Sequence, residues 1–377
     1  MTHNPRSTSP GSTPAAIRLE SVTKVFPGAN GPAVDNLSLE IPEGALTAFV
    51  GPSGCGKTTT LKLINRLIEP TSGSIWVGGT EVGDRPVHEL RRGIGYVIQQ
   101  IGLFPHRTVA ANIATVPGLV GWDRRRTRDR VQELVELVGL DPALLERYPS
   151  ELSGGQQQRV GVARALAVDP PVLLMDEPYS AVDPIVRARL QDELLRLQEQ
   201  VRKTIVLVTH DIDEAIKLSD RIALFNVGGI LEQLGSPEEL LRNPANPFVE
   251  QFLGAERGLK RLALLKVSDL ALTPGPVVSA EDGPAEAKEV MNRFNVDWVG
   301  VLDGDALAGW VPTGALDGVD RVGAAPIERF SAWVGPDTAV RQALDTIVTS
   351  RTPVAVVLDG DRYLGMVFLA QISEGVR

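Results

Sequence analysis

The sequence GPSGCGKT at residues 51–58 decides the fold of this chain. It fits the pattern G-x-x-x-x-G-K-[ST], follows the apolar run Ala45–Val50 and precedes the helix-prone run Lys57–Ile68. A strand, a glycine-rich turn and a helix in this order let the backbone wrap closely around phosphate, because N–H groups and the positive end of the helix dipole then face the anion. The stretch therefore predicts a phosphate-binding loop within an α/β core.

Two residues of this loop carry specific chemistry. We expect the Lys57 ammonium to reach the β- and γ-phosphates of a nucleotide, and the Thr58 hydroxyl to bind Mg²⁺. Cys55 is interpreted as a residue of the loop backbone and not as a nucleophile. The predicted phosphate-binding set is Gly51, Ser53, Gly54, Cys55, Gly56, Lys57, Thr58 and Thr59.

A pair of carboxylates follows another apolar strand. The run Val172–Met175 ends in Asp176 and Glu177. Asp176 suits a position on Mg²⁺, usually through water, and Glu177 suits a general base that orients or deprotonates an attacking water. An Asp-Glu pair alone is more typical of a solvated strand end, but beside a phosphate loop catalysis is the favoured interpretation.

The sequence LSGGQ at residues 152–156 predicts a second anion site. Ser153 can cap the following helix, and Gly154 and Gly155 leave its N–H groups open. The motif lies 176 − 152 = 24 residues before Asp176. Because the loop at residues 51–58 already serves the chain's own nucleotide, we expect the second site to serve the nucleotide of a partner subunit.

Strands alternate with helices through the first two thirds of the chain, which indicates an α/β core containing parallel strands. Alternating runs predict half-buried strands, continuous apolar runs predict strands covered on both faces, and polar periodic runs predict helices. The half-buried strands are Ile17–Val22 and Leu37–Ile41, the covered strands are Ala45–Val50, Pro171–Met175 and Thr204–Thr209, and the helices include Gln156–Ala167 and Val186–Arg202.

The remaining third carries an internal duplication. Residues 296–311 and 352–367 each contain an apolar run, the turn Leu-Asp-Gly-Asp and a second apolar run. Asp-Gly between such runs is a strong hairpin signal, and a helix-prone stretch precedes each copy. A domain boundary is expected between residues 254 and 273. Residues 1–16, rich in Ser, Thr and Pro, are predicted to form a disordered tail.

Composition excludes several classes of protein. The 377 residues suggest two or three domains, and the net charge of −9 argues against a protein that neutralises nucleic-acid phosphates. One cysteine excludes a disulfide framework or a cysteine-built zinc site within one chain. No uninterrupted apolar stretch is long enough to span a bilayer. The first twenty residues lack an apolar signal core, so we expect a cytoplasmic protein.

The order of these motifs, followed by His210, resembles the ATPase subunit of ABC transporters over roughly residues 17–254. The resemblance implies a P-loop ATPase domain with a mixed sheet and a helical subdomain at residues 17–255, binding ATP and Mg²⁺. It implies that Phe26 stacks on adenine, that Gln99 contacts Mg²⁺ or water, and that His210 contacts the γ-phosphate. In full it assigns Glu177, His210 and Gln99 to catalysis, Thr58, Gln99 and Asp176 to the metal, and Phe26, Ser153, Gly154, Gly155, Gln156 and Asp183 to ATP.

Shorter segments resemble one branch of that family, which takes up the osmoprotectants glycine betaine, carnitine, choline or proline. Tyr179-Ser180 departs from the Phe-Gly that is usual there. Residues 273–377, after a linker at 256–272, resemble a smaller α+β domain of tandem cystathionine-β-synthase (CBS) modules. The segments that carry the branch resemblance are 65–70, 98–106, 114–117, 243–248 and 254–257.

The resemblance implies a homodimer, peripheral on the cytoplasmic side of the membrane. Its partners would be integral permease subunits near Gln99 and, indirectly, a substrate-binding protein, with no nucleic acid. The CBS-like region would be regulatory. Thr313 is not followed by the Asp expected three positions later for ribose binding, and the sequence leaves open whether this region binds an adenosine nucleotide or a cyclic dinucleotide, or senses ionic strength.

Two alternatives remain open. The first is an importer of another small solute, such as an amino acid, because the solute never touches this subunit. The second is a soluble ABC-type ATPase acting on DNA or the ribosome. Such proteins typically carry two ATPase modules, a coiled-coil arm or zinc-binding cysteines, whereas this chain has one module, no heptad arm and one cysteine.

Overall fold

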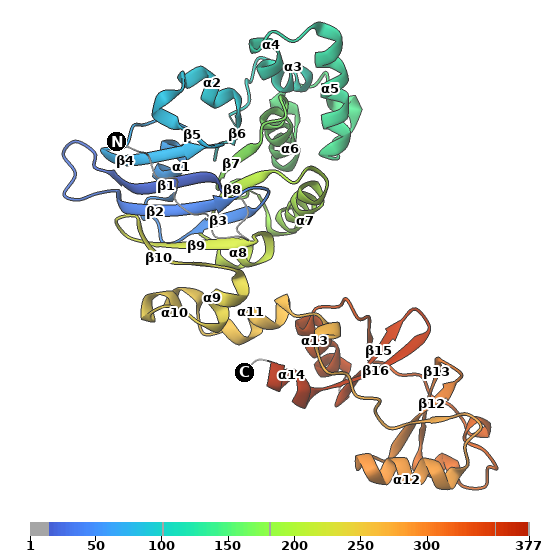
Figure 1. Ribbon diagram of the computed structural model, residues 1–377. Helices are drawn as coiled ribbons and strands as arrows, with labels where there is room; N and C mark the ends of the chain where they lie inside the picture. Colours follow the sequence, from blue (N-terminus) through green and yellow to red (C-terminus); the bar gives the residue numbers. More distant parts are fainter. Residues whose placement is uncertain (1–14, 100–101, 181, 351, 376–377) are drawn as a thin grey trace, which may run out of the picture. The chain divides into compact units, whose positions relative to one another are not determined.

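The computed structural model describes residues 15–99, 102–180, 182–350 and 352–375 (Figure 1). It divides into two compact units, which meet in sequence between Leu253 and Gly254. Of the predicted tail at 1–16, residues 1–14 lie outside the described part. Its last two residues do not belong to a tail, because Ala15 and Ala16 begin strand β1 (Ala15–Lys24) and Ala15 pairs with Pro42.

The centre of the first unit is a six-stranded sheet. Strands β3 (Leu46–Val50), β7 (Val172–Asp176) and β8 (Thr204–Val208) are buried at every position, as expected for strands covered on both faces. The neighbours β9, β3, β8, β7 and β6 run parallel, and β10 is antiparallel to β9. The predicted α/β core is therefore confirmed. The order is β10 (Ile230–Gly235), β9 (Arg221–Asn226), β3 (Leu46–Val50), β8 (Thr204–Val208), β7 (Val172–Asp176) and β6 (Ile94–Val97).

A second sheet of the first unit is antiparallel, which makes the unit a mixed-sheet domain. It has the order β2 (Val34–Pro42), β1, β4 (Ser72–Val77) and β5 (Thr80–Glu81). Its buried side chains join the same hydrophobic cluster as Phe49 and helix α1 (Lys57–Ile64). Helix α1 ends earlier than the expected Ile68, because Arg66 adopts a left-handed φ of 48°.

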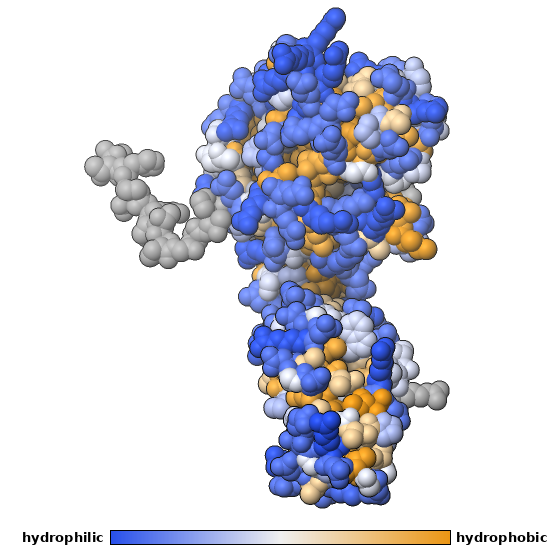
Figure 2. Space-filling model, turned by 90° about the vertical axis from the view of Figure 1, so that its right-hand side faces the viewer, coloured by the Kyte–Doolittle hydropathy of each residue, from blue (hydrophilic) through white to orange (hydrophobic). Residues whose placement is uncertain are grey.

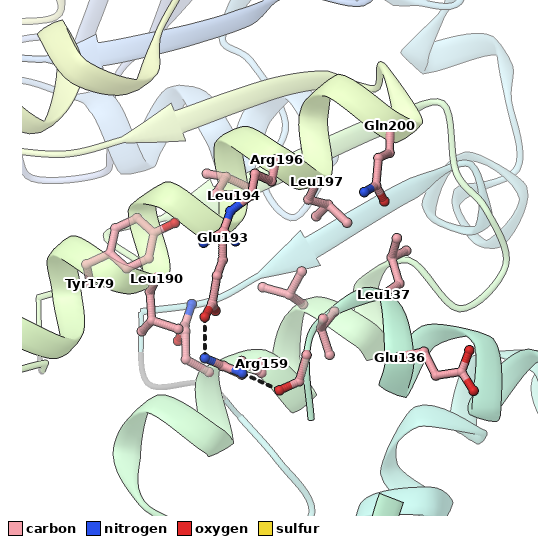
Figure 3. A pocket seen from close by; sticks show the side chains of 14 residues that line it. Glu136, Leu137, Arg159, Tyr179, Leu190, Glu193, Leu194, Arg196, Leu197 and Gln200 are labelled. Carbon is pink, nitrogen blue, oxygen red and sulfur yellow. Dashed lines mark hydrogen bonds and ion pairs between the residues drawn. The ribbon is translucent and has the colours of Figure 1, made fainter. Parts of the chain in front are cut away.

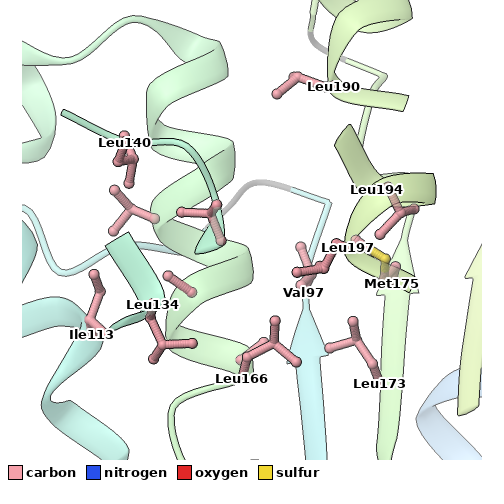
Figure 4. Close-up of a cluster of buried hydrophobic side chains, with 14 of the residues drawn as sticks. Val97, Ile113, Leu134, Leu140, Leu166, Leu173, Met175, Leu190, Leu194 and Leu197 are labelled. Carbon is pink, nitrogen blue, oxygen red and sulfur yellow. The ribbon is translucent and has the colours of Figure 1, made fainter. Parts of the chain in front are cut away.

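A helical layer lies at the β6 edge of the central sheet (Figure 1). Its helices share one hydrophobic core with β7 and the helix that follows it, and this core contains Ile113, Leu134, Leu173 and Leu194 (Figure 4). This layer holds the turn at Ser153 in front of α6. The helices of the layer are α3 (Val109–Ile113), α4 (Thr115–Leu119), α5 (Arg124–Leu137) and α6 (Gly154–Ala165), and α7 (Pro184–Val201) packs against α6.

Shorter helices complete the first unit. They are α2 (Val87–Arg92), α8 (Ile212–Leu218), α9 (Pro237–Arg242) and α10 (Pro247–Leu253). None of the helices in the described part of the chain is long and apolar enough to cross a bilayer. The face drawn in Figure 2 is mostly hydrophilic, with smaller apolar areas between polar residues.

The second unit is one six-stranded sheet built from two equivalent halves. The first half is β11 (Val277–Ser279), α12 (Pro284–Phe294), β12 (Trp298–Asp303) and β13 (Ala306–Pro312); the second is β14 (Trp333–Val334), α13 (Val340–Ser350), β15 (Val354–Asp359) and β16 (Arg362–Phe368). The strand order is β11-β12-β13-β16-β15-β14. In each half the first strand lies at an edge of the sheet, the second strand lies next to it, and the third lies at the centre.

Corresponding positions of the two halves are separated by a constant 56 residues. Strand β15 starts 354 − 298 = 56 residues after β12, and β16 starts 362 − 306 = 56 residues after β13. The hairpin glycines Gly304 and Gly360 have φ of 61° and 62°. Because both the turns and the strand lengths repeat, the duplication inferred from the sequence is present in the structure.

The segment 256–272, expected to be a linker, is structured. Helix α11 (Arg257–Leu264) contacts α13, and Leu262 and Val267 are buried with Val340 in the core of the second unit. The amide of Val267 also donates to the Thr338 carbonyl at 2.9 Å. The linker prediction is therefore wrong, because apolar residues of this segment fill the core of the second unit, which begins at Gly254.

This placement of α11 can be tested by substitution. Leu262 is 2% exposed, whereas Leu259 on the same helix is 42% exposed. We expect Leu262→Ala to lower the free energy of unfolding of the second unit by about 2–5 kcal/mol, because it leaves a cavity. Leu259→Ala should change it by less than about 0.5 kcal/mol. Hydrogen exchange of the β15 amides measures this free energy, and equal effects would contradict the placement.

Candidate nucleotide-binding site

The turn between β3 and α1 requires glycine at two positions. Gly51 and Gly56 have φ of 153° and 92°. A Cβ atom on Gly51 would lie 2.2 Å from the Phe225 carbonyl oxygen, and one on Gly56 would lie 2.3 Å from the Ala33 carbonyl oxygen. Gly56 precedes α1 without any side-chain cap, so the first N–H groups of the helix face the turn. This is the backbone arrangement that binds anions.

A cavity of about 220 Å³ lies over this turn. Lys57 extends across it, because its Nζ donates to the carbonyls of Gly51 at 2.8 Å and Pro52 at 3.0 Å. The Lys57 ammonium is therefore held against the backbone of the predicted phosphate-binding loop. The lining residues are Ser53, Gly54, Cys55, Gly56, Lys57, Thr58, Thr59 and Glu177, so the structure brings together all of the predicted loop residues except Gly51.

Two oxygens suited to Mg²⁺ meet beside this cavity. The Thr58 hydroxyl donates to Asp176 Oδ1 at 2.8 Å, and Asp176 is buried at the end of β7. Hydroxyl and carboxylate oxygens are ligands that Mg²⁺ accepts alongside water and phosphate. Burial raises the pKa of Asp176, and the Glu177 charge adds to this rise, while the Thr58 hydrogen bond opposes it. A cation at this point would offset the cost of burying the carboxylate.

Tyr96 lies close enough to Asp176 to feel its charge, and it was not predicted from the sequence as a site residue. Burial, and then the charge of Asp176, raise the pKa of Tyr96 to about 12. The residue lies on β6 and pairs with Leu174 on β7, two positions before Asp176. Only this strand pairing, which involves segments far apart in the sequence, reveals it.

Glu177 is held between two of the predicted catalytic residues. Gln99 donates from Nε2 to Glu177 Oε2 at 3.3 Å, and His210 Nδ1 lies 3.3 Å from the same oxygen. The backbone of Glu177 has a left-handed φ of 45°, and its amide donates to the Val208 carbonyl at 3.0 Å. A strained non-glycine residue fixed in this way is typical of functional sites.

The turn before α6 has the expected capping geometry. Ser153 Oγ accepts from the Gln156 amide at 3.3 Å, and Gln156 Oε1 accepts from the Ser153 amide at 2.9 Å. A Cβ atom on Gly155 would lie 2.9 Å from Val186, whereas one on Gly154 would meet nothing within 4 Å. Gly155 thus permits close packing of α6 on α7, and Gly154 leaves the turn open.

Other predicted residues do not line the cavity over residues 51–58. Asp183 caps α7, because its Oδ1 accepts from the Val186 amide at 3.0 Å. Phe26 is 39% exposed, and Lys24 Nζ lies 5.2 Å from its ring centroid. Of the segments quoted above, Gln100 and Ile101 lie outside the described residues. The residues of the LSGGQ turn are likewise absent from the described lining of this cavity.

A second hollow, of about 250 Å³, lies between α5, α6 and α7 (Figure 3). Its walls are mainly apolar, and the Arg159 guanidinium crosses it to contact Glu193 and the Gly139 carbonyl. Tyr179 forms one end and is fully buried, which raises the pKa of its hydroxyl. No predicted site residue is among those that line this hollow, so it is not part of the nucleotide site.

Known proteins are similar to this chain over most of its length. A family model described as "ABC transporter" matches residues 34–180. The osmoprotectant import ATP-binding protein OsmV of Salmonella typhimurium is 46% identical over 365 residues, covering 95% of each chain. The glycine betaine/carnitine/choline transport ATP-binding protein OpuCA of Bacillus subtilis is 50% identical over 303 residues, covering 80% of this chain and 79% of the relative.

Solved structures agree with these relatives. A dimeric bacterial ABC transporter cassette is 34% identical, with a TM-score of 0.54, and covers 59% of this chain and 98% of its own. A dimeric post-hydrolysis ATP-binding cassette bound to ADP and Pi is 33% identical, with a TM-score of 0.53 and the same coverage. The predicted P-loop fold with mixed sheets and helices is confirmed. With 46% identity across 95% of a curated relative, the chain belongs to the family of ABC transporter ATP-binding proteins.

Proposed function

We propose that this chain is the ATP-hydrolysing subunit of an importer for an osmoprotectant such as glycine betaine, carnitine, choline or proline. The observation that carries hydrolysis is the position of Glu177, which lines the cavity over the phosphate loop and shares one carboxylate oxygen with Gln99 and His210. The names of the relatives carry the solute class, because they describe osmoprotectant, glycine betaine, carnitine and choline transport.

In this proposal the triphosphate of ATP lies on the turn at residues 51–58. Lys57 binds the β- and γ-phosphates, and exposed Phe26 stacks on adenine. Thr58 and Asp176 would hold Mg²⁺, with Gln99 as a further contact. The metal ion, when bound, neutralises charge on the phosphate oxygens.

Glu177 acts as the general base. It accepts a proton from water as the water oxygen bonds to the γ-phosphorus, and the bond to the departing ADP oxygen breaks. Gln99 and His210 hold Glu177 Oε2 from two sides. Proximity and orientation of this kind contribute to catalysis because the base does not have to find its geometry during the reaction.

The second nucleotide contact comes from a partner copy of the chain. Residues 153–156 form an open, capped helix start that does not line the chain's own phosphate cavity. We infer that this turn and Asp183 face the ATP bound to a second copy. The related solved cassettes are dimers, which supports a homodimer with two shared ATP molecules. ATP then favours the closed dimer, and hydrolysis removes the bridge.

The permease is expected to bind near Gln99 and the segment that follows it. Phe104 is exposed there, while Asn112 fixes its backbone with hydrogen bonds of 2.8 Å and 3.1 Å. An exposed aromatic side chain on a backbone held in this way is suited to a protein interface. The chain would thus be peripheral on the cytoplasmic face, and a substrate-binding protein would act on it only through the permease.

The second unit is proposed to be a tandem CBS-like regulatory module. Its 56-residue repeat supports this assignment. The Thr313 hydroxyl donates to the Asp297 carbonyl at 2.8 Å, so it is already engaged and not free to bind a ribose hydroxyl. The position three residues later, where an Asp would hold the ribose, is the buried Leu316. This observation favours a cyclic dinucleotide or ionic strength over a single adenosine nucleotide as the signal.

Substitution of Glu177 and Lys57 separates catalysis from binding. We expect Glu177→Gln to keep ATP affinity but to lower the turnover number by about 10²- to 10⁴-fold, because the general base is lost. Lys57→Ala should instead lose ATP affinity while its thermal unfolding temperature is retained. Fluorescent-nucleotide titration and steady-state phosphate release measure the two quantities. Unchanged turnover in Glu177→Gln would refute the assignment.

Uptake assays test the solute class. In membrane vesicles that carry the chain with its permease, unlabelled glycine betaine or choline should suppress uptake of labelled glycine betaine, and Glu177→Gln should abolish that uptake. An amino acid such as glutamine serves as the matched competitor. Competition by glutamine but not by betaine would favour the alternative of an importer for another solute.

Deletion of the second unit tests regulation. Removal of residues 254–377 should leave ATP hydrolysis in place but remove its response to salt or to added cyclic dinucleotide, because the two units have separate cores. A coupling of about 1–3 kcal/mol corresponds to a change of about 5- to 150-fold. Removal of residues 273–377 is a poorer choice, since it exposes Leu262 and Val267. The same response to both signals after deletion would rule out regulation by this unit.

A further inference from the structure

Helices α7 and α8 each follow a segment of the nucleotide site. Helix α7 begins directly after Asp183, and α8 begins directly after His210 and its cap Asp211. Any contact between the first two turns of α7 and the first turn of α8 therefore connects the two segments. The structure contains such a contact, and it is polar and buried.

The centre of the contact is the pair Gln191 and Glu214. Gln191 Nε2 donates to Glu214 Oε1 at 3.0 Å, and the two residues are only 7% and 6% exposed. Removing one partner of a buried pair leaves the other without its hydrogen bond, which is costly in a low-dielectric interior. Burial raises the pKa of Glu214, against the hydrogen bonds that it receives from Thr209 and Gln191. The relative position of the Gln191 and Glu214 side chains is therefore strongly fixed.

On one side, Glu214 holds the residues that flank His210. Thr209 hydrogen bonds to the Glu214 carboxylate, and its Oγ1 accepts from the Asp211 amide at 3.0 Å. Asp211 Oδ1 in turn accepts from the amides of Asp213 and Glu214 at 2.9 Å and 3.3 Å. His210 thus lies between two residues that are both tied to the first turn of α8.

On the other side, α7 holds the turn at Asp183. Arg187 donates from Nη2 to the Val182 carbonyl at 3.1 Å, and its Nη1 lies 3.9 Å from the Asp211 carboxylate. Residues 187 and 191 are one helical turn apart and share a face of α7. Helices α7 and α8 are therefore joined at two successive turns of α7, the first two after Asp183, and at the start of α8 after His210.

We propose that Gln191 and Glu214 are positioning residues that transmit the position of the Asp183 turn to His210, and through His210 to the Glu177 carboxylate. The inference rests on the proposed function, in which Asp183 faces the ATP of the partner copy. Closure of the partner then sets the geometry of the base in this copy, so that hydrolysis proceeds only when both halves of the dimer are in place. Neither residue is among those that line the cavity over residues 51–58.

The chain offers a matched control. Lys217 on α8 forms an ion pair with Asp192 on α7 at 2.7 Å, joining the same two helices on their exposed side. We expect Gln191→Leu to lower the turnover number for ATP about tenfold with a KM for ATP within about twofold, because Gln191 acts on geometry and not on binding. Lys217→Met should leave both constants unchanged. Steady-state phosphate release by the full-length chain measures them.

Two further variants separate positioning from general stability. In a His210→Ala background, Gln191→Leu should cause no additional loss, since its effect passes through His210. Exchanging the two side chains, as Gln191→Glu with Glu214→Gln, rebuilds one amide–carboxylate hydrogen bond between the helices. We expect the turnover number of this double variant to lie within about threefold of the wild type. Gln191→Glu alone should have a much lower turnover number, because it places two carboxylates together.

The outcomes distinguish this inference from the function on which it rests. Absence of ATP hydrolysis in the wild-type chain would contradict the proposed function itself. An active wild type with Gln191→Leu equal to Lys217→Met would overturn the positioning role, as would a loss that adds fully to that of His210→Ala. If thermal unfolding shows that Gln191→Leu does not fold, the exchanged double variant is compared with Gln191→Glu alone. Equal turnover numbers in these two variants would overturn the positioning role.

Discussion

The register of three parallel strands is the constraint on which the site depends. Phe49 on β3 and Asp176 on β7 both pair with Val208 on β8, so the three strands end in one row. Their next residues then lead into the phosphate loop, Glu177 and the turn at His210. The hydrogen bond from Thr58 to Asp176 crosses this row and joins residues 118 positions apart in the sequence. A slip of β7 by one residue would turn the Asp176 side chain to the opposite face of the sheet.

Those parts of the site that are encoded locally could be predicted from the sequence. The turn at residues 51–58 and the cap at Ser153 each depend on neighbouring residues, so their patterns identify both place and conformation. Gln191 and Glu214 have no such pattern, because their pairing depends on how α7 packs against α8. Tyr96 is similar, since only the pairing of β6 with β7 brings it near Asp176.

In the second unit, too, local turns could be predicted from the sequence, whereas contacts between distant segments could not. Asp-Gly turns predict the hairpins β12–β13 and β15–β16, because the turn chemistry is local. The joining of the two hairpins into one sheet rests on a single ladder pair, Ala306 with Arg362, and on the Tyr363 amide donating to the Asp305 carbonyl at 2.9 Å. Helix α11 was missed for a related reason: its short apolar stripe has meaning only once the core of the second unit exists to receive Leu262.

A division between rigid and adjustable parts follows from this arrangement. Glu177 stands at the end of a fully buried strand, in a strained conformation that typically costs on the order of 1–3 kcal/mol and persists because the Val208 carbonyl holds its amide. Gln99 and His210, which hold its carboxylate, stand outside the strands, in turns. Turns adjust at lower cost than central strands, because fewer buried contacts are lost. In the proposed function, control of Glu177 would therefore act through Gln99 and His210. Gln99 approaches it from the segment near the proposed permease contact, and His210 approaches it from the turn before α8, which packs against α7.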